Sequence, residues 1–259
     1  MKLNISFLEK SNYDIKRGIT FPEELTEDLA ELIGIVVGDG HLSVIERSNF
    51  MVKKFTQSAV YISGNKNEKE YLDYVSILFK NLFNCDFSYR EDKRSDAVLL
   101  TKYSKGIVNY LNQVCKIPIG KKSNIVKVPS IILNSSNDIK YAFLRGLADT
   151  DFYVAFKKTK NNYPVIRGSF KSIHIVKDLE ILFTDLGFIH SCCYDINLND
   201  KRWGKYKMHA IYLNGRNNLE RWNRLIGFNN PKITQRISNS YKKNKKEPQA
   251  RVEFTVNGK

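Results

Sequence analysis

Two short segments of the chain repeat one pattern of apolar and small residues, and each ends in an acidic residue. The first is LIGIVVGDG, residues 32–40, and the second is LRGLADTDF, residues 144–152. In both copies two small residues stand four positions apart, so they share one face of a helix. The pattern predicts motif helices over about 27–39 and 138–151. One such helix in each half indicates two tandem copies of one structural unit.

The apolar periodicity downstream of each motif is repeated as well. Alternating residues predict strands, and apolar side chains at helical spacing predict the helices that follow them. Each half is therefore predicted as helix, strands, helix, strands, helix. That order is typical of an α+β unit whose antiparallel sheet is covered by helices on one face. The predicted strands and helices cover residues 50–62, 71–82, 98–111, 165–170, 175–186 and 210–222.

The spacing between the motifs and later lysines is also repeated. Lys122 follows Asp39 by 83 residues, and Lys232 follows Asp151 by 81 residues. The polar stretch 134–138 can cap a following helix, so it is the predicted boundary between the halves. We therefore expect an N-terminal half over 1–136 and a C-terminal half over 137–259. The second half ends in a basic tail that includes residues 242–248.

The small residues of the motifs indicate close contact between the two helices. Glycine inside a helix costs about 0.5–1 kcal/mol relative to alanine, so two glycines in one short helix call for a structural reason. We expect Gly34 and Gly38 of the first helix to pack against Gly146 and Thr150 of the second. Side chains this small allow two helix backbones to approach closely.

Two motif helices packed in this way would bring Asp39 and Asp151 together. Neighbouring carboxylates repel, and one of them takes up a proton unless a cation lies between them. Mg²⁺ accepts oxygen ligands and favours sites with one or two carboxylates plus phosphate oxygens. The carbonyl groups of Gly38 and Thr150 are at helix ends and are candidates for further ligands. This arrangement suits metal-dependent hydrolysis of a phosphodiester.

Composition favours a polyanionic partner. The 259 residues include 42 Lys and Arg but only 27 Asp and Glu, which gives a formal net charge of +15. Nucleic acid is the first candidate for such a chain. The longest apolar run near a motif is too short to span a bilayer, and the N-terminus lacks the apolar core of a signal peptide. We expect an intracellular protein that is not secreted. The four cysteines and four histidines show no zinc-binding spacing, which favours incidental free thiols.

With two motifs, two terminal acids and matched lysines, the chain resembles the LAGLIDADG homing endonucleases in their monomeric two-motif form. The resemblance spans about residues 23–236. It implies two αββαββα halves whose antiparallel sheets form a saddle over DNA. It also implies a monomeric enzyme of intron homing that makes site-specific double-strand breaks with short 3′ overhangs. Mg²⁺ would be the cofactor, and Ca²⁺ would support binding without cleavage.

The resemblance also implies roles for individual residues. Asp39 and Asp151 would bind metal, whereas Asp149 aligns outside the metal site. Lys122 and Lys232 match the family's basic residues by order and spacing, with the neighbouring Lys121 as an alternative to Lys122. A polar residue at the end of the second strand would organise water, and its candidates are Gln57, Asn65 and Lys171.

DNA recognition is expected on the exposed face of each sheet. Along 205–212, alternation places Lys205, Lys207 and His209 on one face, which we expect to meet DNA. The other face, with Tyr206, Met208 and Tyr212, would then pack against helices. Because the two halves differ, the target should be long and asymmetric. The candidate DNA-binding residues are Lys53, Gln57, Asn65, Arg90, Lys93, Arg94, Lys102, Arg167, Lys171, Lys205, Lys207 and His209.

One departure from the family pattern keeps an alternative open. The family has glycine after each catalytic acid; the first copy keeps Gly40, but the second has Phe152. Phe152 favours a protein that binds nucleic acid on the same scaffold without cutting it, either an intron RNA maturase or a DNA-binding regulator. The two intact acids favour the enzyme. An intein is not expected, because Met1 stands first and the chain ends VNGK.

Overall fold

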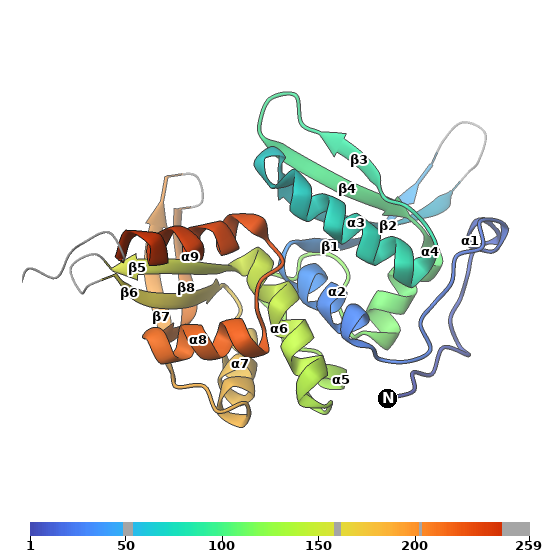
Figure 1. The fold of residues 1–259 in the computed structure, drawn as a ribbon. Helices are drawn as coiled ribbons and strands as arrows, with labels where there is room; N and C mark the ends of the chain where they lie inside the picture. The colour runs from blue at the N-terminus through green and yellow to red at the C-terminus, as the bar shows by residue number, and fades with distance from the viewer. Residues whose placement is uncertain (49–53, 158–161, 202–203, 245–259) are drawn as a thin grey trace, which may run out of the picture.

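The computed structural model describes residues 1–48, 54–157, 162–201 and 204–244 (Figure 1). Its first half contains α1 (Asn12–Lys16), α2 (Glu27–Gly38), β1 (Gly40–Arg47), β2 (Phe55–Asn65), η1 (Lys66–Glu68), α3 (Lys69–Phe83), β3 (Ser88–Glu91), β4 (Ala97–Tyr103), α4 (Lys105–Asn109), η2 (Tyr110–Val114) and α5 (Ser130–Leu133). Its second half contains α6 (Asn137–Asp151), β5 (Phe152–Lys157), β6 (Tyr163–Phe170), α7 (Ile173–Asp185), β7 (His190–Asp200), β8 (Gly204–Asn214), α8 (Arg216–Leu225) and α9 (Pro231–Asn244).

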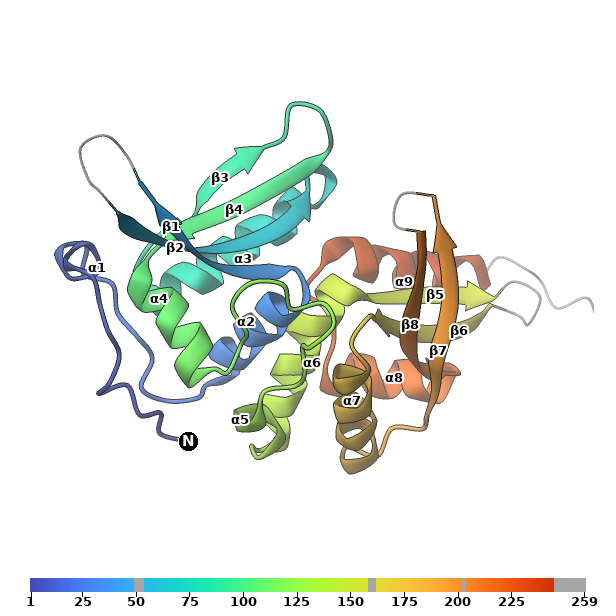
Figure 2. The same ribbon diagram turned by 180° about the vertical axis from the view of Figure 1, so that it is seen from behind.

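Each half contains one antiparallel four-stranded sheet, with strand orders β1-β2-β4-β3 and β5-β6-β8-β7. Helix α3 lies behind the first sheet in Figure 2, and α8 and α9 lie behind the second, so this view looks onto the uncovered faces of both sheets. Helices α2 and α6 cross between the sheets (Figures 1 and 2). The predicted α+β fold with two similar halves, joined through the motif helices, is confirmed.

The motif helices form where the sequence predicts them, and local capping explains their starts and stops. The Thr26 hydroxyl accepts a hydrogen bond from the Leu29 N–H at 3.2 Å, which satisfies one of the unpaired N–H groups at the start of α2. Helix α2 ends at Gly38, and Asp39 follows as its C-cap. Helix α6 continues through Asp151 before the chain extends at Phe152.

The strand after each motif helix was not predicted. β1 begins directly at Gly40 and β5 directly at Phe152, with no connecting loop after the helix. In β1 only the first half of the strand is buried, and its last residues are exposed on both faces. Such a strand lacks the clean alternation from which a half-buried strand is predicted.

Apolar side chains fill the space between each sheet and its helices, and they continue across the α2–α6 contact as one cluster. Leu29, Leu32 and Ile33 of α2 are fully buried, as are Phe143 and Leu147 of α6. Among the described residues, no helix is long and apolar enough to cross a membrane. The division at residues 136 and 137 stays a prediction; α6 begins at Asn137. The predicted basic tail lies largely outside the described residues.

Candidate active site

Helices α2 and α6 pack at backbone distance through their glycines, and they make the most extensive contact between any two elements. A Cβ added to Gly34 would overlap the carbonyl oxygen of Phe143, and one added to Gly146 would overlap that of Glu31. Both obstacles are backbone atoms, which cannot rotate away. Any larger residue at either position would therefore push the helices apart.

The close approach continues to the C-terminal ends of both helices. Gly38 faces Thr150, whose Oγ1 donates a hydrogen bond to the Leu147 carbonyl oxygen at 2.9 Å. A Cβ at Gly38 would lie 2.8 Å from Oδ2 of Asp151. The residue after Gly38 is Asp39, so the crossing places the two motif acids at one point between the sheets.

The two acids influence each other electrostatically. Burial raises the pKa of Asp39 to about 7; the Asp151 charge adds to this rise, and the Lys122 ammonium opposes it. Burial likewise raises the pKa of Asp151 to about 6, again opposed by Lys122. Asp39 remains accessible to water on one side. The burial that raises its pKa therefore comes from the protein packed densely around its other sides.

Lys122 supplies the positive charge beside this pair. Its Nζ donates to the carbonyl oxygens of Val36 at 2.9 Å, Gly38 at 2.5 Å and also Val37, which are unpaired acceptors at the end of α2. Burial lowers the pKa of this ammonium to about 8, and the two acids oppose the change. The ammonium therefore stands where a cation would neutralise the acids and bind the Gly38 carbonyl.

The two acids open into different cavities. Asp151 lines a groove of about 330 Å³ together with Lys122, Lys171, Tyr206 and Met208. Asp39 lines a much smaller cavity of about 40 Å³, whose other polar walls include Glu68, Asp149 and Asn230. The groove beside Asp151 therefore contains two lysines, whereas the cavity beside Asp39 contains two additional carboxylates. The tandem repeat does not produce two identical sites.

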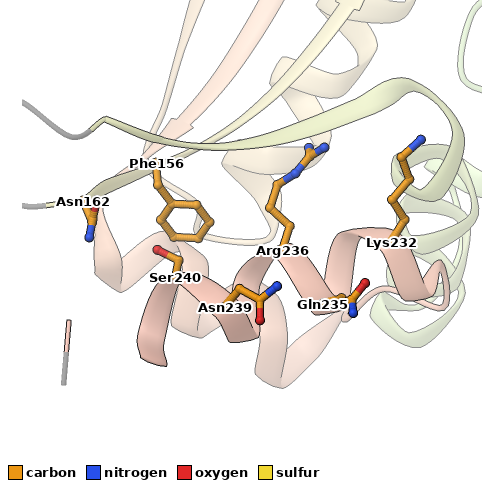
Figure 3. Close-up of a pocket in the computed structure, with 7 residues that line it drawn as sticks. All are labelled: Phe156, Asn162, Lys232, Gln235, Arg236, Asn239 and Ser240. Carbon is orange, nitrogen blue, oxygen red and sulfur yellow. The ribbon is translucent and has the colours of Figure 1, made fainter. Parts of the chain in front are cut away.

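Lys232 does not occupy a position equivalent to that of Lys122. It lies at the start of α9, beside a surface groove of about 390 Å³ between this helix and β5 (Figure 3). Its exposed Nζ is 3.4 Å from Oε1 of Glu68, and within the described part of the chain no ion pair joins it to Asp39 or Asp151. The two lysines are matched in sequence spacing, but only Lys122 contacts the helix ends.

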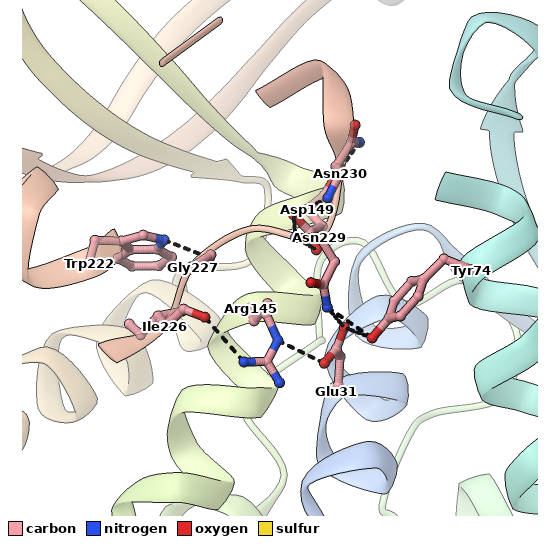
Figure 4. A network of polar contacts seen from close by, with 9 residues as sticks. All are labelled: Glu31, Tyr74, Arg145, Asp149, Trp222, Ile226, Gly227, Asn229 and Asn230. Carbon is pink, nitrogen blue, oxygen red and sulfur yellow. Dashed lines mark hydrogen bonds and ion pairs between the residues drawn. The ribbon is translucent and has the colours of Figure 1, made fainter. Parts of the chain in front are cut away.

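A buried polar network centred on Glu31 holds the crossed motif helices in place (Figure 4). The Glu31 carboxylate is 2 % exposed and accepts hydrogen bonds from Tyr74 at 2.6 Å, Asn229 at 2.7 Å and Arg145 Nε at 2.8 Å. These residues come from α3, the α8–α9 connector and α6, so one side chain joins both halves. Glu31 was not predicted from the sequence, since its only signal is an acid inside an apolar helix.

Asp149 lies in the same region, and its hydrogen bonds give it a structural role. Its carboxylate accepts the backbone N–H groups of Asn229 at 3.0 Å and Asn230 at 3.1 Å. Burial raises its pKa to about 7, while these two N–H groups oppose the rise. Asp149 therefore ties the α8–α9 connector, which leads to Lys232, to the second motif helix. The first copy has Val37 at the equivalent position.

Several predicted DNA-binding residues lie on the uncovered faces of the sheets. Arg90 pairs with Leu99 and Leu99 with Ser63, so all three share the face that contains Gln57 and Asn65. In the second sheet Arg167 lies beside Tyr212, with its guanidinium 5.3 Å from the ring centroid. Arg94 is exposed at the β3–β4 turn and Lys171 is exposed beside Asp151.

The three candidates for organising water are separated by the structure. Lys171 lines the groove with Asp151. The Asn65 side chain instead accepts the Asn67 N–H at 2.9 Å and caps a short helix. Gln57 lies five residues along β2 from Ile62, the partner of Gly40, which is roughly 17 Å at 3.3 Å per residue. Lys171 is therefore the candidate that lies beside a motif acid.

Two predicted DNA contacts were wrong. Lys102 is 7 % exposed on the covered face of β4, where its Nζ donates to the Asp86 carbonyl oxygen at 3.3 Å. His209 is 6 % exposed, and its Nδ1 accepts the Asp195 N–H at 3.2 Å. Both side chains are used inside the fold, because alternation defines two faces without showing which one the helices cover.

The prediction also assigned the covered and uncovered faces of β8 the wrong way round. Tyr206 and Met208 line the groove beside Asp151, whereas Ile211, on the His209 face, is buried. Lys205 and Lys207 share the His209 face but are exposed, and Lys207 Nζ forms an ion pair with Asp195 at 3.0 Å. Both remain predictions as DNA contacts. Lys53 lies outside the described residues.

The donor atoms at the helix ends fit a hard divalent cation. Asp39, Asp151 and the Gly38 carbonyl supply oxygen ligands, which Mg²⁺, Mn²⁺ and Ca²⁺ prefer. Burial is the main cause of the raised pKa values of both acids, and a cation bound between them would favour their ionised forms. Such a cation would compete with Lys122 for the Gly38 carbonyl.

Comparison with known proteins gives distant matches in sequence. No family model matches the chain. It is 22% identical over 220 residues to the glutamine–fructose-6-phosphate aminotransferase of Methanocaldococcus jannaschii, and 25% identical over 204 residues to a DNA polymerase of that organism. It is also 25% identical over 221 residues to one subunit of the A-type ATP synthase of Pyrococcus abyssi.

These matches cover 77–85% of this chain but only 11–18% of the relatives, so the chain spans less than a fifth of each. The three named activities are unrelated, although the matches overlap on this chain. We therefore transfer none of those activities to it.

Solved structures give a consistent answer for the fold. The chain matches I-DmoI in complex with DNA and Mn with a TM-score of 0.54 and 16% identity, over 79% of this chain and 98% of that one. It matches the meganuclease I-SmaMI bound to uncleavable DNA with a TM-score of 0.53 and 15% identity, over 83% and 89%. I-DmoI is described as a homing endonuclease. The chain therefore has the fold of the homing endonuclease I-DmoI and of the meganuclease I-SmaMI, and this agrees with the fold that the motif resemblance predicted.

Proposed function

We propose that the protein is a site-specific DNA endonuclease that requires a divalent metal, with Mg²⁺ as the natural ion. The observation that carries the proposal is the meeting of Asp39 and Asp151 at the crossed ends of α2 and α6, between the two sheets. Structures with the same fold contain DNA with Mn and with Ca. We further propose a double-strand break with short 3′ overhangs.

Each residue then has a defined part in phosphodiester hydrolysis. Asp39 and Asp151 bind the metal, and the Gly38 and Thr150 carbonyls are proposed as further ligands. Bound Mg²⁺ would activate water and stabilise charge on the phosphate oxygens. Lys122 stabilises negative charge beside Asp151, and Lys171, in the same groove, is placed to orient water. Lys232 is proposed for the corresponding place near Asp39, which it reaches by leaving Glu68.

DNA would lie across both sheets. Because the halves carry different side chains on those faces, a monomer would recognise a long asymmetric target. Arg90, Arg94 and Arg167 are proposed contacts there, since arginine binds guanine bidentately and also phosphate. Such a protein would act inside the cell, where the host DNA is, as expected of an enzyme of intron homing.

The alternative is a protein that binds DNA or intron RNA without cutting it, and its support came from Phe152. This residue has φ −101° and ψ 153°, an extended conformation open to any residue. Its ring is buried against Phe170 and Trp222. Phe152 therefore does not distort the end of α6 in a way that argues against cleavage.

The first test is cleavage of a selected target. Duplexes with a randomised segment are bound in Ca²⁺, recovered and sequenced, and the preferred duplex is then incubated in Mg²⁺. We expect cutting at one position on both strands, lost in Asp39→Asn and in Asp151→Asn while binding in Ca²⁺ persists. Specific binding by the wild-type protein with no cutting in Mg²⁺ or Mn²⁺ would contradict the enzyme and favour the non-cleaving alternative.

A further inference from the structure

A second set of metal-binding side chains lies away from the motif acids, where α7 covers the start of β7. Glu180 of α7 and His190 and Cys192 of β7 each offer one ligand atom, and the three atoms lie within 4.8 Å of one another. His190 and Cys192 are two residues apart, so both point from the same face of the strand. This is the covered face, since their partners in β8, Leu213 and Ile211, are each 1 % exposed.

The surroundings hold two of these side chains in place. Nδ1 of His190 is 3.2 Å from the Phe188 carbonyl oxygen. If Nδ1–H donates to that oxygen, Nε2 keeps its lone pair, and this second hydrogen bond is typical of metal-binding histidines. The Tyr194 hydroxyl donates to Oε2 of Glu180 at 2.7 Å, which orients the carboxylate in the same manner.

The ligand types identify the class of cation. Thiolate, imidazole and carboxylate together suit Zn²⁺, whereas Mg²⁺ and Ca²⁺ prefer oxygen alone. Ligand atoms at 2.0–2.3 Å from a tetrahedral ion lie roughly 3.3–3.7 Å apart. A spread of at most 4.8 Å closes by small rotations of the Glu180 side chain, which has three rotatable bonds. A water molecule would complete the four ligands.

We propose that Glu180, His190 and Cys192 form a zinc site that clamps α7 to β7. On binding, the Cys192 thiol loses its proton to solvent as the sulfur–zinc bond forms, so the step needs no oxidant or reductant. The site is separate from the motif acids: Phe152, which follows Asp151, lies on β5, three strands across the sheet from Cys192 on β7, roughly 14 Å at about 4.8 Å per strand. It therefore stands independently of the proposed cleavage. The hydrogen-bonded chain Tyr194–Glu180 and the ring of Phe183, 6.3 Å from that of His190, complete its walls.

The spacing of cysteines alone did not predict this site. The sequence contains no paired C-x-x-C motif, and His190 and Cys192 form only a short H-x-C segment. Glu180 becomes a neighbour of His190 and Cys192 because α7 packs against β7, the strand that follows it.

Cobalt provides a direct test with the whole chain, because a thiolate bound to Co²⁺ gives a charge-transfer absorption that carboxylate ligands do not. Metal-free protein is titrated with Co²⁺ and then with Zn²⁺. We expect one equivalent of thiolate-bound Co²⁺, displaced by one equivalent of Zn²⁺. The absorption should be lost in Cys192→Ser, and Glu180→Gln and His190→Gln should weaken binding at least tenfold. Tyr194→Phe keeps all three ligands and should weaken binding about 10-fold to 100-fold.

Two matched variants separate this site from other thiols and acids. Cys193→Ser alters the next residue, which is exposed and points to the opposite face of β7, and should retain the absorption. The double variant Asp39→Asn with Asp151→Asn removes the motif acids and should also retain it. Loss of the absorption in Cys193→Ser, or its survival in Cys192→Ser, would overturn the assignment.

A measurement on the wild-type protein avoids any dependence on how variants fold. Zn²⁺ should protect Cys192 from alkylation while Cys193 reacts at an unchanged rate, as read by mass spectrometry of the peptide that contains both. Equal reactivity of Cys192 with and without one equivalent of Zn²⁺ would overturn the proposal.

Discussion

Phe152 lies directly opposite Gly168 in the β5–β6 pair, and its ring occupies the space where a Cβ of Gly168 would stand. The equivalent pair in the first half is Gly40 opposite Ile62. The larger residue of the pair therefore lies on β2 in the first half and on β5 in the second half. At Gly40 a Cβ would lie 2.5 Å from Cα of Val36, so only the first copy needs glycine after its acid.

This pairing predicts a coupled effect on stability. Phe152→Ala should cost about 3–5 kcal/mol, because it removes a buried ring from contact with Phe170 and Trp222. Gly168→Val should destabilise the wild type by overlap with the Phe152 ring, but much less in the Phe152→Ala background. Urea unfolding of the two single variants and the double variant measures the coupling, expected at about 0.5–3 kcal/mol. Additive effects would mean that the two residues do not share this space.

The ion pair between Glu31 and Arg145 is predicted to hold the two halves together. Glu31→Gln should lower the free energy of unfolding by about 3 kcal/mol, the low end for a broken buried pair, because the Arg145 side chain is 23% exposed. Asp195→Asn breaks the Lys207 pair, whose side chains are 62% and 58% exposed, and should have little measurable effect because water already screens the two charges. Equal losses in chemical unfolding would show that burial does not distinguish these pairs.

The two lysines of the repeat are predicted to contribute unequally to cleavage. Lys122→Met should slow single-turnover cleavage by about 10²-fold or more, since its ammonium is the positive charge beside both acids. Lys232→Met should have an effect about tenfold smaller, because its exposed side chain pairs with Glu68.

Lys121→Met is the matched control for Lys122, since it changes an exposed neighbour with the same charge. Its cleavage rate should stay close to that of the wild type. A rate for Lys121→Met as low as that for Lys122→Met would assign the role to the wrong lysine. Labelling each DNA strand separately would show which strand each lysine affects.

The acid pair predicts a pH-dependent response to metal. In the metal-free protein the pKa values of Asp39 and Asp151 are raised to about 7 and about 6. The stability that these groups contribute is therefore fully present below the ordinary aspartate pKa and is lost as pH rises through about 6–7. Metal binding requires the ionised acids, so Mg²⁺ should raise the melting temperature more at about pH 8 than at about pH 5.

Variants of the acids separate this effect from general ion binding. Asp39→Asn with Asp151→Asn should abolish the Mg²⁺-dependent shift at both pH values. Without metal, the double variant should gain stability relative to the wild type as pH rises, because asparagine stays uncharged. A wild-type shift that is equal at both pH values would contradict raised pKa values at this site.

The faces of the first sheet predict which basic residues contribute to DNA binding. Arg90→Ala should weaken binding in Ca²⁺, and it should reduce the salt slope by about 0.9 for each phosphate that is no longer neutralised. Lys102→Met changes a buried lysine on the covered face and should leave the salt slope unchanged. Affinity measured at several salt concentrations gives both slopes. A lower slope for Lys102→Met would mean that the sheet presents its other face to DNA.

The sequence by itself determined the repeated architecture and its chemical centre. The glycines of the two motifs predict helices in close contact because no other residue permits that approach. An acid after each helix then places two carboxylates at one point, and the excess of lysine and arginine indicates a nucleic-acid partner. These conclusions depend on local periodicity and on a repeat within one chain, both of which a sequence shows directly.

Only the tertiary structure decided which side chains reach the same space. Alternation along β4 and β8 separates two faces equally well whichever face the helices cover, so Lys102 and His209 were placed on the wrong one. Matched spacing could not show that Lys122 caps α2 while Lys232 pairs with Glu68. Glu31 and the set of Glu180, His190 and Cys192 acquire partners through packing between distant segments. Such contacts leave no periodic trace in the chain.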